Sequence, residues 1–126
     1  MEILEIQWDE RSEEGQATVR FPRSSPFFAG HFPAAPILPG VVLIDAAVQI
    51  AARAMRRQLR LSQLSNAKFT NAVEPDQVVG LSFKVSPGPA DASRVKIAGK
   101  WNREGAKIAE FQFAAAQEGG GDGPQA

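Results

Sequence analysis

The sequence contains no cysteine, a single histidine and a formal net charge of zero. Without cysteine there is no disulfide, no thiolate metal ligand and no cysteine nucleophile, and nothing indicates an oxidising compartment. One histidine without cysteine gives no support for a metal site. Zero net charge argues against electrostatic binding of nucleic acid by the whole molecule, so a charged partner would have to meet a local patch.

Long apolar runs and common catalytic signatures are also missing. The longest apolar run, Val41 to Ile50, is interrupted by Asp45 and Gln49 and is too short to span a bilayer. Residues 1–5 carry acids where a signal peptide would carry bases. Neither a nucleotide-binding glycine loop nor a G-x-S-x-G serine motif occurs. We therefore expect a cytoplasmic protein with no membrane or nucleic-acid partner.

The 126 residues are most simply one domain, which we place at residues 1–116. Alternating apolar residues predict a hairpin of two strands over residues 3–8 and 16–21. Three or four further strands are expected after Ser62, beginning with a short one at residues 66–70. Residues 117–126 are glycine-rich, so we expect a disordered tail.

One helix is predicted between the two groups of strands, opening at Pro39-Gly40 and running to about Leu59. Its first three turns are apolar on nearly every side apart from Asp45 and Gln49, which is typical of a helix buried in the middle of a fold. This order of elements predicts an α+β fold in which an antiparallel sheet wraps around one long central helix.

The loop before this helix contains the only histidine, His31. Prolines at 22, 26, 33, 36 and 39 exclude regular structure and make the loop stiff, which suits the holding of one side chain. A neutral imidazole near pH 7 can abstract a proton. The alternative is a loop histidine that only hydrogen-bonds to backbone.

Two positions of the predicted helix are candidates for chemistry. Asp45 is surrounded in sequence by apolar residues, and burial there would raise the pKa of the carboxyl and suit it to act as a general acid. Its alternative role is a carboxylate that the helix dipole favours. Gly40 lies at the helix start, where free N–H groups can hold a developing oxyanion, unless the glycine merely opens the helix.

Four arginines near the end of the predicted helix follow the spacing i, i+3, i+4 and i+7: Arg53, Arg56, Arg57 and Arg60. This spacing would place them on one helix face. They complement the C-terminal dipole at a solvated helix end, or they dock an acidic partner.

The segment from Phe27 to Gln49 resembles the 3-hydroxyacyl-acyl carrier protein dehydratases of the hotdog fold, of the FabZ/FabA type. Their signature reads G-H-F-P-x-x-P-x-x-P-G-V, followed by an acid fourteen residues after the histidine, and His31 and Asp45 have that spacing. Residues 67–69, Val73 and Pro75-Asp76 resemble the next strand and turn of the family. The resemblance covers roughly residues 16–116.

The resemblance implies a role for each candidate residue. His31 would remove the C2 proton of a 3-hydroxyacyl thioester, and Asp45 would assist departure of the C3 hydroxyl as water. The N–H groups of Gly40 and Val41 would bind the thioester carbonyl. Family members are homodimers or higher oligomers in which His31 of one chain would meet Asp45 of the other. An acidic acyl carrier protein would dock on the arginines, and no cofactor is implied beyond the phosphopantetheine arm that carries the substrate.

The sequence departs from the family pattern at Asp45, where the commoner short dehydratases have glutamate, at Ala34, where glycine is usual, and in lacking their N-terminal helix. Short aspartate-bearing relatives include dehydratases of aryl-polyene or polyketide-like pigment pathways, so the resemblance covers fatty-acid and specialised lipid biosynthesis. Two other functions remain open. One is an acyl thioesterase that uses the helix carboxylate, and the other is a non-catalytic module that binds acyl carriers.

Overall fold

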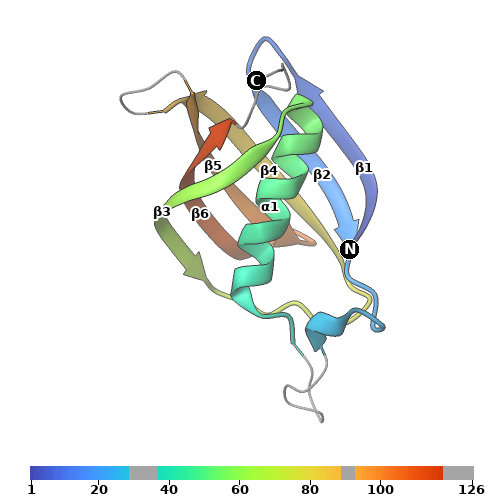
Figure 1. Ribbon diagram of the computed structural model, residues 1–126. Coiled ribbons are helices and arrows are strands. Elements are labelled where there is room, and N and C mark those ends of the chain that lie inside the picture. Colours follow the sequence, from blue (N-terminus) through green and yellow to red (C-terminus); the bar gives the residue numbers. More distant parts are fainter. Residues whose placement is uncertain (29–36, 89–92, 118–126) are drawn as a thin grey trace.

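Figure 1 shows an antiparallel sheet curved around one helix, in a computed structural model that describes residues 1–28, 37–88 and 93–117. In chain order the elements are β1 (Glu2–Asp9), β2 (Glu14–Arg20), the 3-10 turn η1 (Pro26–Phe28), α1 (Gly40–Met55), β3 (Leu59–Phe69), β4 (Val78–Pro87), β5 (Arg94–Arg103) and β6 (Ala106–Gln117). The predicted α+β architecture is confirmed.

The strands form one sheet in the order β1-β2-β4-β5-β6-β3, and every neighbouring pair is antiparallel. β1 and β2 form the predicted hairpin, and β5 and β6 form a second one. The second hairpin turns at Glu104 and Gly105, whose φ angles of 51° and 83° are left-handed, as a tight two-residue turn requires. β1 and β3 are the two edges of the sheet.

The buried face of the sheet follows from the alternation of side chains along each strand. On β4, Val79, Leu81, Phe83 and Val85 are buried, whereas the residues between them are at least partly exposed. The other central strands alternate in the same way along most of their length, so the inward side chains form one continuous core. α1 lies across this buried face (Figure 1).

The helix is fixed to the sheet by apolar packing and by one specific hydrogen bond. Leu43, Ala47 and Ile50 are buried against the sheet. Trp101 of β5 is fully buried, and its indole Nε1–H donates to the backbone carbonyl of Leu43 at 3.1 Å. Because a buried N–H group without an acceptor is costly, this bond sets where the first half of α1 rests.

The predicted end of the helix, near Leu59, is wrong. α1 ends at Met55, and Arg56 adopts the left-handed conformation with φ 57°. The N–H groups of Arg56 and Arg57 then bond to the carbonyls of Arg53 and Ala52, which closes the last turn in a Schellman arrangement. The arginine spacing continues past this point, but the chain has left the helix, so only Arg53 is helical.

The strand that follows is longer than expected. β3 covers eleven residues and pairs with β6, whereas the sequence predicted a short strand at residues 66–70. Every residue of β3 is exposed or half-exposed, so the strand carries no alternation of buried and exposed positions. That missing pattern explains why its first half was not predicted.

The end of the chain extends the fold by one residue beyond the predicted domain. Gln117, which the sequence assigned to the tail, is the last residue of β6, and the rest of the predicted tail, residues 118–126, lies outside the described residues. Among the helices of the described segments, none is long and apolar enough to cross a membrane.

Candidate active site

The first turn of α1 has backbone N–H groups for which no described residue provides an acceptor. Pro39 precedes the helix and provides no side-chain cap, and the first turn bond runs from the N–H of Val42 to the carbonyl of Pro39 at 3.0 Å. Within the described part of the chain, the N–H groups of Gly40 and Val41 have no hydrogen-bond acceptor. Such groups carry partial positive charge at a helix start and can bind an oxygen that gains negative charge.

Gly40 is also a point of close approach. The ring of Phe69, at the end of β3, lies so near that a Cβ built on Gly40 would be 2.9 Å from its Cζ atom. Phe69 is 47% exposed, so its ring forms an accessible apolar wall beside the helix start. The sequence included Phe69 in the family resemblance but gave no indication of this contact.

Asp45 lies on the exposed side of α1, which contradicts the expectation of a buried carboxylate. It is exposed, as is Gln49 one turn later, and Val41 one turn earlier is 74% exposed. The helix is therefore not buried all round, and the desolvation expected for Asp45 is absent in the single chain. Apolar neighbours in sequence predicted burial, but on a helix these neighbours point in other directions.

Among the described residues, the Asp45 carboxylate has one hydrogen-bond partner. Gln49 Nε2 donates a hydrogen bond to Asp45 Oδ2 at 2.6 Å. The two residues are four apart, which places them on the same helix face. This bond leaves Oδ1 of Asp45 available to another group and limits rotation of the carboxylate.

A groove of about 1230 Å³ runs between this face of α1 and the edge strand β3. Its floor and walls include Val41, Asp45 and Gln49 from the helix and Leu61 and Leu64 from the strand. The groove therefore combines apolar side chains with a single carboxylate. An acyl chain or an apolar protein surface fits the apolar part of this lining.

The four arginines also line this groove, although they do not share a helix face. Arg53 lies in the last turn of α1, Arg56 and Arg57 follow the helix, and Arg60 lies on β3. All four are exposed. The turn between α1 and β3 brings them together at one end of the groove. The predicted arginine cluster is therefore present, but the turn forms it and not a shared helix face.

His31 lies outside the described residues, as does the rest of the segment 29–36. The described residues that flank this segment are well anchored, since Phe28 before it and Leu38 after it are both buried. Among the residues that the structure describes, no group of three or more His, Asp or Glu side chains could hold a metal ion.

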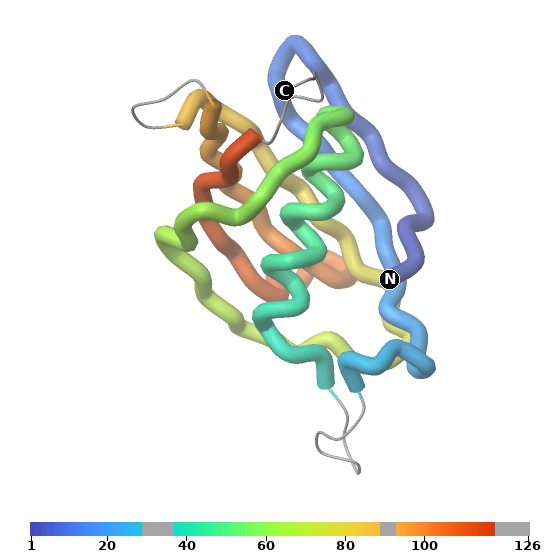
Figure 2. Tube along the Cα trace, in the orientation of Figure 1, coloured from blue at the N-terminus to red at the C-terminus, as the bar shows by residue number. Residues whose placement is uncertain are grey.

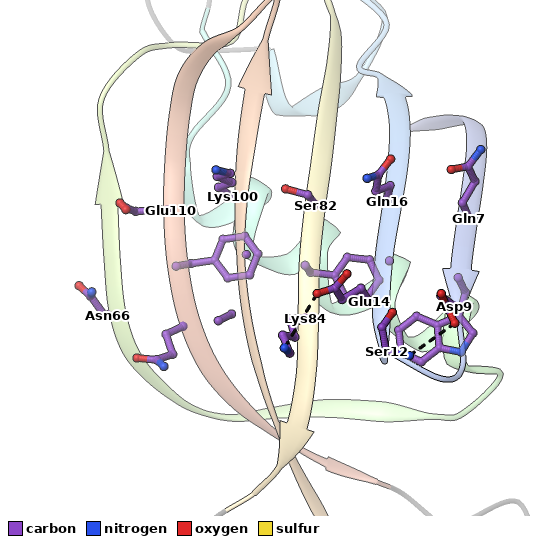
Figure 3. Close-up of a pocket in the computed structure, with 17 residues that line it drawn as sticks. Gln7, Asp9, Ser12, Glu14, Gln16, Asn66, Ser82, Lys84, Lys100 and Glu110 are labelled. Carbon is purple, nitrogen blue, oxygen red and sulfur yellow. Dashed lines mark hydrogen bonds and ion pairs between the residues drawn. The ribbon is translucent and has the colours of Figure 1, made fainter.

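A second hollow, of about 770 Å³, lies on the outer face of the sheet, opposite the helix (Figure 3). Among its charged lining residues, Lys84 pairs with Glu14 at 3.9 Å, and Glu110 pairs with Lys107, which lies outside the lining, at 3.0 Å. The hydrogen bond from Lys107 lowers the pKa of the Glu110 carboxyl. Because it lies across the sheet from Asp45 and the helix start, this hollow is not part of the candidate site.

Fold and site together define an α+β protein of the hotdog type, whose central helix has an exposed carboxylate and first-turn N–H groups without an acceptor among the described residues. The chain belongs to the ApeI-like family, whose model is described as ApeI dehydratase and matches residues 7–97. The resemblance to hotdog dehydratases is therefore confirmed.

The chain is similar to the 3-hydroxyacyl-[acyl-carrier-protein] dehydratase FabZ of Caulobacter vibrioides, with 30% identity over 105 residues. The match covers 76% of this chain and 66% of that protein, just under two thirds of its length. Among solved structures, the dehydratase heterocomplex ApeI:P from Xenorhabdus doucetiae has a TM-score of 0.69 at 16% identity and covers 91% of this chain and 96% of its own. A hypothetical thioesterase with coenzyme A from Streptococcus pneumoniae has a TM-score of 0.65 at 14% identity, with coverage of 93% and 87%. These two structures support the fold.

Proposed function

We propose that this protein dehydrates (R)-3-hydroxyacyl thioesters to trans-2-enoyl thioesters by general acid/base catalysis. The observation that carries the proposal is the placement of one exposed carboxylate, Asp45, on the same helix as the N–H groups of Gly40 and Val41, which no described residue accepts. A leaving hydroxyl and a thioester carbonyl are separated by two carbons in the substrate. One helix therefore offers a group for each of them, and membership of a dehydratase family supports this assignment.

The reaction assigns one task to each group. His31 removes the proton from C2, and the electron pair moves toward the thioester carbonyl, whose oxygen is stabilised by the N–H groups of Gly40 and Val41. The C2–C3 double bond then forms as the C3–O bond breaks. The departing hydroxyl takes up a proton from the Asp45 carboxyl and leaves as water, and the proton that His31 removed from C2 restores that carboxyl. Gln49 keeps the carboxylate in position.

We propose a homodimer formed along β3. This strand is hydrogen-bonded to β6 on one side, and on its other side it pairs with no strand among the described residues. Leu64 on β3 and Val41 on α1 are exposed at 46% and 74%. A long edge strand with exposed apolar side chains favours pairing with another strand. A second copy there would cover the groove and bring its own His31 toward Asp45.

We propose that an acyl carrier protein delivers the substrate on its phosphopantetheine arm. The exposed arginines at one end of the groove supply positive charge for an acidic carrier surface. The arm would then enter beside α1 and reach the helix start. Fatty-acid and specialised polyene or polyketide-like pathways both use such thioesters.

A thioesterase is the second candidate, because an exposed helix carboxylate could activate water and a hypothetical thioesterase has a similar fold. The two functions are separated by a panel of (R)-3-hydroxyacyl and saturated acyl thioesters. We expect enoyl absorbance from the hydroxyacyl substrates, no released thiol, and no enoyl product from His31→Ala. Thiol release from saturated substrates would favour the thioesterase, and carrier binding without any turnover would indicate a binding module. Undiminished dehydration by His31→Ala would reject the proposed base.

A further inference from the structure

One short segment between β3 and β4, residues 73–76, contacts the chain on both sides of the segment 29–36. Figure 2 shows the two described chain ends that border this segment lying close to each other, at the end of the molecule where α1 begins. Before the segment 29–36, residues 73–76 bond to Phe21 and Arg23. After it, they bond to Leu38. The same connection therefore sets where the chain leaves β2 and where it enters α1.

Asp76 both donates and accepts a hydrogen bond with the chain that follows β2. Its backbone N–H donates to the carbonyl of Phe21 at 2.8 Å, and its Oδ1 accepts the backbone N–H of Arg23, also at 2.8 Å. Pro22 lies between these two residues and has no N–H to offer. Asp76 thus satisfies the two main-chain groups that flank Pro22 just after β2 ends.

The backbone of Asp76 is itself held in an uncommon conformation. Its φ is 69°, in the left-handed region that aspartate adopts more readily than most residues. Arg20 Nη1 approaches Oδ1 at 3.1 Å, and the same guanidinium pairs with Glu2 at 2.8 Å. A residue keeps an uncommon backbone conformation only when surrounding contacts hold it there, and the bonds of Asp76 provide such contacts.

The contact after the segment 29–36 is a hydrogen bond between main-chain groups. The N–H of Leu38 donates to the carbonyl of Val73 at 2.8 Å, and both side chains are buried. Leu38 comes two residues before Gly40, so this bond also fixes the start of α1. Arg103 braces the connection, because its Nη1 donates to the carbonyl of Ala72 and to Oε1 of Gln77, each at 3.1 Å.

We propose that Asp76 is a positioning residue for His31, which follows Arg23 by eight positions, and that it acts by fixing the exit of β2 relative to the helix start. This inference rests on the proposed role of His31 as the base. Asp76 does not touch substrate. Its carboxylate holds the main chain of Arg23, and the Val73–Leu38 bond holds the chain just before α1, so a single connection fixes the chain on both sides of the segment that contains His31.

The test uses the fact that the chain has one histidine, so its imidazole gives one Cε1–Hε1 cross-peak in an NMR spectrum. Asp76→Ala removes the acceptor for Arg23 and Asp76→Gly does so while accepting the left-handed φ. We expect both variants to shift or broaden the His31 cross-peak and to lower kcat roughly tenfold, with KM within about twofold of the starting value. Asp76→Asn keeps an acceptor oxygen and tolerates this φ, so its His31 cross-peak and its kcat should be close to those of the starting protein.

Asp9 provides a matched control. Its Oδ1 accepts the backbone N–H of Arg11 at 2.9 Å in the β1–β2 turn, at the other end of the sheet. Asp9→Ala therefore removes the same kind of bond and should leave the His31 cross-peak and kcat unchanged. The indole N–H resonance of Trp101 reports in the same spectra whether the core is intact; if Asp76→Ala disturbs it, Asp76→Gly carries the test.

Failure of this inference is distinct from failure of the proposed function. An unchanged His31 cross-peak in Asp76→Gly, or a lowered kcat without any change of that peak, would overturn the positioning role even if His31→Ala is inactive. A cross-peak that moves in Asp76→Gly while His31→Ala remains active would support the structural coupling and reject the base. A changed His31 cross-peak together with a lowered kcat in Asp9→Ala would also contradict the proposal, because the effect would not be specific to Asp76.

Discussion

Gln49 Nε2 lies 2.6 Å from Asp45 Oδ2, one helical turn further along the exposed side of α1. This bond holds the carboxylate in one orientation at the surface of the groove. We expect Gln49→Ala to lower kcat roughly tenfold with little change in KM, because an unrestrained carboxylate spends less time in the reactive orientation. Gln49→Glu, which places a second carboxylate beside the first, should be at least as damaging. Steady-state kinetics on one 3-hydroxyacyl thioester measures both, and a large rise of KM alone would indicate a binding role instead.

The contact between Gly40 and Phe69 gives a second prediction. A methyl group at position 40 would meet the ring of Phe69 at 2.9 Å, but the ring is half-exposed and can move. Gly40→Ala should therefore cost at most about 1 kcal/mol in the free energy of unfolding, and the cost should vanish in a Phe69→Ala background. Denaturant unfolding of the two single variants and the double variant measures this coupling. Additive effects would show that the ring does not limit position 40.

The bond from Trp101 to Leu43 predicts a stability effect at the helix. Trp101→Phe leaves a cavity in a fully buried position and removes the donor to the Leu43 carbonyl, so we expect a loss of about 2–4 kcal/mol. Trp8→Phe is the matched control. Trp8 is only partly buried and stacks on Phe83 at a centroid distance of 6.0 Å, so its loss should be clearly smaller. Equal losses in urea unfolding would argue against a special role for the indole bond.

The arginine cluster predicts salt-sensitive carrier binding. Replacing Arg53 and Arg57 with alanine should weaken binding to an acyl carrier protein and flatten its dependence on salt, because two positive charges leave the groove. Lys96→Ala with Lys100→Ala removes the same charge from exposed positions on the outer face of β5 and should have little effect. If both double variants bind alike, the arginines are ordinary surface.

Local sequence patterns predicted the central strands and the helix start because these elements bury one face or one end in a regular way. The alternation at Val79 to Val85 and the Pro39-Gly40 helix opening are examples. The family signature predicted Gly40 and Asp45 as candidate site residues through their place in the motif and their spacing from His31. Such signals are local, so they could be read without knowing the tertiary structure.

Three features could not be read in this way. The helix end at Met55 depends on the left-handed Arg56, which neither composition nor the arginine spacing indicates. β3 carries no alternation, because none of its eleven residues is buried in the described chain. The exposure of Asp45 depends on which side of α1 meets the sheet. Contacts between distant segments, such as those of Phe69 with Gly40 and of Asp76 with Arg23, leave no trace in local pattern.

The most direct test of the proposed active site mixes two inactive variants. In a homodimer whose sites join His31 of one chain to Asp45 of the other, a mixed dimer of His31→Ala and Asp45→Asn contains one intact site. After unfolding and refolding together in equal amounts, about a quarter of all sites should be intact, and the rate of enoyl thioester formation should rise to about that share of the starting rate. The separately refolded variants should stay inactive. If the mixture forms mixed dimers yet produces no enoyl thioester, His31 and Asp45 do not form a dehydratase site between two chains.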